Sequence, residues 1–316
     1  MATNVNGTST EDTKRAEEFL KKKLSFRGNA FLIIHEMVKL NATHPTLLMD
    51  EFLHSIFFLG KLNDPKFIPE SLVSNDKEIS KMLKDFPRPF ALYSSHLPKR
   101  SPFSCVLDMI VHLYGENDEK EIRKRLQDFV SELKKGGSNG LFSSTICVSQ
   151  SDIPKGTRYY GVSMSTSGCN PRRIMIAASC LSSWDSKVAD AVMTYYPNKT
   201  KNPDFDGTIK LPQHVRCQAY DICPIKEKPP CKSCGNLFGL GTSEKKEWPY
   251  GNCAEAESLS NLLKDDERVR EQVQPTSETC TDKNREKVKK SVLTELKRLL
   301  GKKSKWKNTN FYDPRV

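Results

Sequence analysis

The spacing of hydrophobic residues predicts that the first 135 residues of the chain are mostly helical. Acidic residues follow Thr10, as at a helix N-terminus, and Phe19, Leu20 and Leu24 then form an apolar stripe. Further helices are predicted near 28–41, from Pro45 onward, near 103–113 and over 117–135. The last of these ends at the glycine cluster 136–140, which is the clearest domain boundary in the sequence.

The pattern changes in the second half of the chain. Residues 159–164 and 173–178 are strand-like, and the loop between them favours a β-hairpin. A helix is expected over 185–196, weak strands over 208–222 and a basic helix over 283–300. The fold class predicted from these patterns is α+β, with a helical N-terminal region followed by a sheet-containing domain.

The length of 316 residues suggests about two domains. We expect a disordered tail at 1–9, a helical domain at 10–135, a linker at 136–140, a second domain at 141–300 and a basic tail at 301–316. His35, His54 and His112 fall on apolar helical stretches, so we expect them to be core residues.

Composition excludes some classes of protein. No stretch approaches the roughly 20 uncharged apolar residues of a membrane span, which excludes an integral membrane protein. The N-terminus lacks the basic and apolar regions of a signal peptide, so we expect a cytoplasmic or nuclear location. The ten cysteines are then expected to be reduced thiols, some of them metal ligands.

The net charge of +11 is concentrated near the C-terminus, because residues 283–307 carry 11 basic and 2 acidic residues. Candidate nucleic-acid contacts in this segment are Lys302, Lys303, Lys305, Trp306 and Lys307, with RNA or single-stranded DNA as the partner. An anionic membrane surface and a merely solvated tail are the alternatives. Binding to a membrane would require the apolar stripe of this helix to stay undocked.

Two motifs carry metal chemistry. The first is P-C-x-x-C, in which the spacing of Cys231 and Cys234 allows both thiolates to bind one zinc ion. The second is C-x-E, in which Cys253 and Glu255 open a predicted helix with Asn252 as its N-cap. A thiol at a helix N-terminus has a lowered pKa, which suits a thiolate ligand.

Together these motifs resemble the zinc-binding signature of the cytidine deaminase-like superfamily, over roughly residues 157–265. The resemblance implies a three-layer α/β domain with a mixed sheet. It also implies that Cys231, Cys234 and Cys253 bind zinc, and that Glu255 moves protons during deamination of a cytosine or adenine base. A role in innate antiviral defence would follow from this resemblance only.

The order of the motifs departs from that family, in which C-x-E precedes P-C-x-x-C. Three arrangements therefore remain open: a rewired site, a ligand role for Cys280, or motifs that never meet. In a rival arrangement, four residues from the set His214, Cys217, Cys223, Cys231 and Cys234 form a closed structural zinc site. The alternative function is then a non-catalytic zinc protein that binds nucleic acid, or a protein partner through its helical domain.

Overall fold

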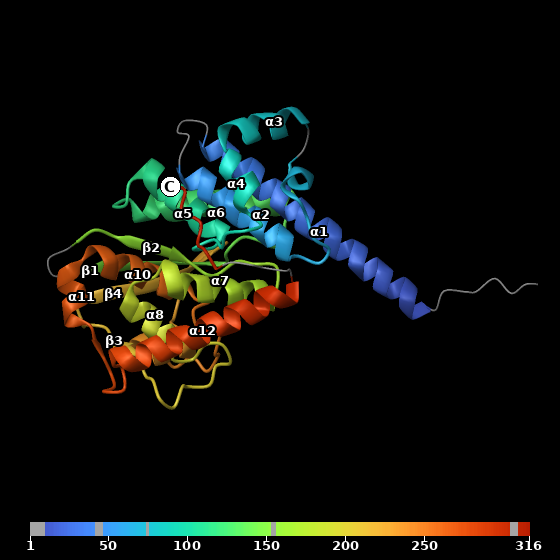
Figure 1. Cartoon of the computed structure of the whole chain (residues 1–316). Helices are drawn as coiled ribbons and strands as arrows, with labels where there is room; N and C mark the ends of the chain where they lie inside the picture. Colours follow the sequence, from blue (N-terminus) through green and yellow to red (C-terminus); the bar gives the residue numbers. More distant parts are fainter. Residues whose placement is uncertain (1–9, 42–46, 74–75, 153–155, 304–308) are drawn as a thin grey trace, which may run out of the picture.

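The computed structural model describes residues 10–41, 47–73, 76–152, 156–303 and 309–316 (Figure 1). Its N-terminal region is helical, as predicted. The helices are α1 (Thr10–Leu40), α2 (Leu47–Leu62), a 3₁₀ turn (Pro69–Leu72), α3 (Asp76–Asp85), α4 (Pro87–Leu92), α5 (Pro102–Tyr114) and α6 (Glu119–Lys135). The two helices expected before residue 41 form one continuous helix, α1, because no proline separates them and Gly28 is tolerated within it.

The second half contains a four-stranded sheet in the order β2-β1-β4-β5. Its strands are β1 (Thr145–Ser151), β2 (Tyr159–Val162), β4 (Val215–Ile222) and β5 (Ile225–Lys228). Every pairing between these strands is antiparallel, so the expected mixed sheet is wrong, while the α+β class is confirmed. A separate short pair joins β3 (Ile209–Lys210) to β6 (Gln274–Pro275).

The two faces of the sheet contact different helices. Cys147 and Ala219 face Ala254 of α10 (Ala254–Asp265). On the other face Tyr220 lies under Arg123 of α6, with the guanidinium carbon 4.0 Å from the ring centroid. The sheet is therefore a middle layer with helices on both sides.

The predicted hairpin after residue 158 is only half right. Its first strand is β2, but its second segment lies in α7 (Cys169–Ser182). The apolar run 174–178 is buried at every position, and a short buried run of this kind has no periodicity that separates strand from helix. The helix starts after Gly168, whose φ of 121° favours glycine.

Helices α8 (Ser186–Met193), α9 (Lys232–Phe238), α11 (Glu267–Gln272) and α12 (Asp282–Lys303) complete the fold. The apolar stripe of α12 is buried, at Val288, Val292, Leu296, Leu299 and Leu300. Figure 1 shows α12 lying along α7 and α8. Among the described helices, none is long and apolar enough to cross a membrane.

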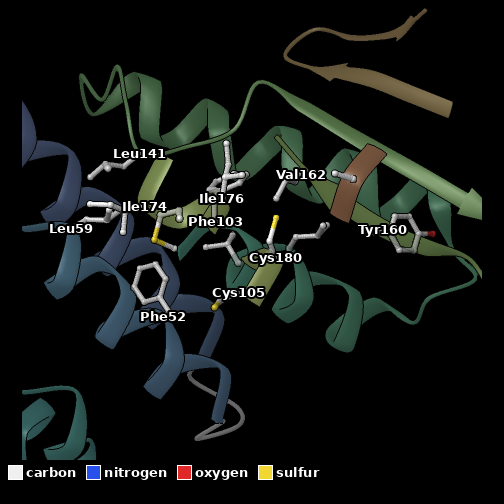
Figure 2. Close-up of a cluster of buried hydrophobic side chains, with 14 of the residues drawn as sticks. Phe52, Leu59, Phe103, Cys105, Leu141, Tyr160, Val162, Ile174, Ile176 and Cys180 are labelled. Atoms are coloured by element: carbon white, nitrogen blue, oxygen red, sulfur yellow. The ribbon is translucent and has the colours of Figure 1, made fainter. Parts of the chain in front are cut away.

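One hydrophobic cluster runs through both halves of the molecule. Phe52 and Leu59 of α2 belong to it, as do Val162 of β2 and Ile174 of α7 (Figure 2). The segment 136–140 lies between α6 and β1, where Asn29 donates to the side-chain oxygen of Asn139 over 3.1 Å. The domain boundary at 136–140 stays a prediction.

The C-terminal residues return to the helical region. Tyr312 is 1% exposed, its ring stacks on His54 at 3.7 Å, and its hydroxyl donates to Asp50. Residues 311–312 were expected in a basic tail, but Phe311 forms a bridge with Leu97. Of the three histidines expected in the core, His54 is buried, whereas His35 and His112 are exposed.

Candidate functional site

Three cysteines from two motifs meet beside the sheet. The Sγ atom of Cys231 lies 3.4 Å from that of Cys253 and 3.7 Å from that of Cys234. All three Sγ atoms lie within 4.8 Å of one another, so this three-cysteine group could hold a metal ion. It is the one such group among the residues that the structure describes. The two motifs therefore meet, although their order along the chain is reversed.

Two helix starts bring these thiols together. Cys231 is the N-cap of α9 and Cys253 is the N-cap of α10, one residue later than the predicted Asn252 cap. The loop over residues 239–253 joins the two helices. Gly251 turns this loop with a φ of 83°, a conformation that residues with a side chain rarely adopt. The Met164 amide donates to the Asn252 carbonyl over 2.8 Å, which fastens the loop to the segment after β2.

The start of α10 is pressed against β2 at Gly161. A Cβ atom there would lie 2.3 Å from the Ser258 amide nitrogen and 2.6 Å from the Ala254 carbonyl oxygen, so only glycine permits the contact. The buried carboxylate of Glu257 accepts a hydrogen bond from the Val162 amide over 2.8 Å. These contacts fix the position of the first turn of α10, and with it Cys253 and Glu255.

The thiols influence one another's ionisation. Hydrogen bonds with Cys234 and Cys253 lower the pKa of Cys231 to about 2. The same hydrogen bonds with Cys231 contribute most to raising the pKa values of Cys234 and Cys253. One negative charge is therefore stable in the group, whereas three neighbouring thiolates would repel one another unless a cation lay between them.

Glu255 lies at the second position of α10 and is 4% exposed. Burial, and to a smaller degree the charge of Cys231, raises the pKa of its carboxyl group, although a hydrogen bond with Cys234 opposes this rise. A carboxyl group in such surroundings can accept and release a proton closer to neutral pH than an exposed one.

A cleft of about 240 Å³ opens beside the group, and we call it the Cys231 cleft. Cys231, Cys253 and Glu255 line it, whereas the buried Cys234 lies behind them. Its other walls come from the segment before β1, the residues after β2, α7, the end of β5, and the loop between α9 and α10. They include Phe142, Ser143, Ser163, Met164, Arg172, Lys228, Trp248 and Asn252.

The other candidate ligands lie elsewhere. Cys280 lies by Arg285 and Asp190, with its Sγ atom 3.7 Å from an Arg285 nitrogen, so it does not join the group. The rival closed site is not formed either, because the Sγ atom of Cys217 lies 3.6 Å from that of Cys147. Cys223 contacts Ser131 instead.

The basic candidates Lys302, Lys303, Lys305, Trp306 and Lys307 have side chains outside the described part of the chain. Several cleft residues were not predicted. Arg172 adjoins a segment expected to be a strand, and Lys228 carries no motif. Trp248 could have been suspected, because an aromatic residue precedes the C-x-E motif by five positions.

Comparisons of this chain with protein-family models, with curated proteins and with solved structures return no match.

Proposed function

We propose that the protein is a zinc-dependent hydrolytic deaminase that acts on a cytosine or adenine base in the Cys231 cleft. The observation that carries this proposal is a group of three thiols beside a cleft that two of them, Cys231 and Cys253, line together with the buried Glu255. Three protein ligands with a fourth position left open are typical of catalytic rather than structural zinc.

The geometry of the thiols suits zinc. Tetrahedral coordination with Zn–S bonds of about 2.3 Å separates two sulfur ligands by roughly 3.8 Å. The measured separations from the Cys231 sulfur, 3.4 Å and 3.7 Å, are close to this value. Thiolate ligands also favour zinc over magnesium or calcium, which prefer oxygen. Cys231, Cys234 and Cys253 would hold the ion, and the cleft that Cys231 and Cys253 line would give a substrate access to it.

Glu255 would carry the protons of the reaction. Zinc lowers the pKa of a coordinated water to about 7 and so supplies a nucleophile at neutral pH. The Glu255 carboxylate would accept a proton from the attacking water and pass it to the ring nitrogen beside the reacting carbon. It would then help to protonate the amino group, which leaves as ammonia while a carbonyl group remains on the ring.

Glu255→Gln tests the enzyme proposal, because glutamine keeps the size of the side chain but cannot carry a proton. Activity is measured as ammonia release from cytidine, adenosine and their polymers, together with zinc content. We expect at least a hundredfold loss of rate with zinc retained, while the exposed Glu244→Gln control stays active. Wild-type protein that binds zinc but releases no ammonia would be a non-catalytic zinc protein.

We propose that the protein binds a nucleic acid through the basic segment after residue 301. Two observations support this proposal: residues 283–307 are strongly basic, and α12 packs against the protein through its apolar stripe. Because the stripe is buried against the protein, it is not free to enter a membrane, so the lysines beyond it are better suited to phosphates.

A further inference from the structure

Arg172 lies in the wall of the Cys231 cleft, and among the residues that the structure describes it has no carboxylate partner. Four arginines of the described chain have a buried Nε atom with no hydrogen bond: Arg123, Arg158, Arg172 and Arg173. The first two lie within 4.0 Å of Glu119, and Arg173 lies 3.0 Å from Glu295. For Arg172 the structure gives no ion pair among the described residues, and its Nη2 contacts only the Cys169 sulfur, at 3.4 Å.

A buried N–H group without a partner costs free energy, and a guanidinium group binds phosphate with two parallel hydrogen bonds. The other basic residue of the cleft, Lys228, is already paired with Asp221 at 2.6 Å. Glu255 is the one carboxylate among the described cleft residues, and it is buried beside the cysteines. The unpaired positive charge of the cleft is therefore at Arg172.

An aromatic surface borders the same cleft. The Trp248 side chain is 40% exposed, which is unusual for a large apolar ring, and the Lys246 ammonium lies 4.0 Å from its centroid. The Ser233 hydroxyl donates to the Trp248 carbonyl over 2.6 Å and fixes this loop to α9. Aromatic rings placed in this way stack on bases or sugars.

On the basis of the proposed function, we infer that the substrate is a base linked to a phosphate group rather than a free nucleoside. Arg172 binds the phosphate, Trp248 packs against the base or sugar, and the amino group of the base points to the three-cysteine group. A free nucleotide and one unit of a nucleic-acid strand both offer this chemistry. The cleft volume of about 240 Å³ lies below the roughly 300–1,000 Å³ of most ligand pockets, so the cleft can enclose no more than one nucleotide unit.

The test measures binding by titration calorimetry on zinc-loaded Glu255→Gln protein, so that turnover does not interfere. The ligands are cytidine and adenosine, their 5′-monophosphates, and tetranucleotides of each base. We expect one base to bind at least about tenfold more tightly with its phosphate than without it. Arg172→Gln should remove most of this advantage and leave the affinity for the nucleoside unchanged.

Arg173→Gln is the matched control, because it removes the neighbouring guanidinium, which already has a carboxylate partner. It should leave the preference for the phosphate intact. A preference found with monophosphates identifies a free nucleotide as the source of the phosphate, and one found only with tetranucleotides identifies a strand. Equal affinity for nucleoside and both phosphate forms would overturn the inference, as would an equal effect of Arg172→Gln and Arg173→Gln.

The two proposals fail separately. Ammonia release from wild-type protein that is equally fast for nucleoside, nucleotide and tetranucleotide would support the deaminase and reject the phosphate site. Tight phosphate-dependent binding without any ammonia release would support the site at Arg172 and reject the deaminase.

Discussion

The sulfur atoms of Cys231 and Cys253 lie 3.4 Å apart, although the two residues belong to different motifs and begin different helices. Because each residue caps a helix, the distance between their thiols depends on how α9 and α10 are held against the sheet. Metal binding should therefore respond both to the ligands and to the contacts that position the two helices.

The first prediction concerns the metal itself. Purified protein should contain about one zinc ion per chain, measured by plasma emission spectroscopy. Cys231→Ser should lower the zinc content several-fold, because it removes the thiolate that contacts both other sulfurs. Cys169→Ser is the control, because Cys169 is exposed and outside the three-cysteine group. Zinc content that is the same in both variants would exclude the three-cysteine group as the metal site.

Gly161→Ala tests the contact that positions α10. A methyl group there would meet the α10 backbone at 2.3 Å, and backbone cannot yield as a side chain can. We expect a loss of roughly 1–3 kcal/mol in the free energy of unfolding, together with weaker zinc binding. The measurements are chemical denaturation and competition with a chelator.

Gly28→Ala is the matched control for Gly161→Ala, because nothing lies within 4 Å of the Cβ position at Gly28 in α1. It should leave zinc affinity unchanged and stabilise the helix slightly. Unchanged zinc affinity in Gly161→Ala would mean that the site tolerates movement of α10.

Much of the fold could be predicted from periodicity. Helices α6 and α12 lie close to their expected ranges because each buries one apolar face. Helices α5 and α8 also lie close to their expected ranges, although they are buried at most positions. Strand β1 was missed, since its last three residues, Ser149, Gln150 and Ser151, are polar yet buried between β2 and β4. Their burial depends on pairing with strands far along the chain, which local pattern does not reveal.

The site was predictable only in part. The C-x-x-C and C-x-E spacings identified the three thiols and Glu255, because the chemistry of a metal ligand limits the residue type and its spacing. Arg172 and Lys228 could not be found in this way. They reach the cleft only because α7 and the end of β5 approach it in three dimensions.

The basic segment at the C-terminus predicts binding that weakens steeply with salt. Lysines release counterions from phosphates, so each lost contact reduces the slope of log K against log salt by about 0.7 for single strands. Replacing Lys302, Lys303, Lys305 and Lys307 with glutamine should therefore flatten the slope with little change in stability. Fluorescence anisotropy with single-stranded RNA and DNA, at several salt concentrations, measures the affinity and hence this slope.

The matched control for the basic segment replaces four exposed lysines of the helical region, Lys66, Lys84, Lys120 and Lys124, with glutamine. The net charge changes equally in both variants, so only a local effect of the C-terminal lysines would separate them. Equal slopes would mean that general charge attraction, not this segment, binds the nucleic acid. Absence of binding to RNA and single-stranded DNA at low salt would reject the partner.

His54 predicts how stability depends on pH. The ring is fully buried against Tyr312, and its Nε2 atom lies 3.4 Å from the Leu92 carbonyl oxygen. Burial lowers the pKa of His54 from 6.5 to about 3. The unfolded chain therefore binds a proton between these values that the folded chain does not bind. The stability due to neutral His54 is complete above pH 6.5 and is lost as the pH falls toward 3.

His54→Phe should remove this dependence while keeping the ring stacked on Tyr312. Each unit of pKa shift corresponds to about 1.4 kcal/mol, so the free energy of unfolding of wild type should fall by a few kcal/mol more than that of the variant between pH 6.5 and 4. Urea denaturation at several pH values measures the difference. His112→Phe, at an exposed position of α5, is the control and should follow wild type. Parallel curves for wild type and His54→Phe would mean that His54 can take up a proton without leaving the core.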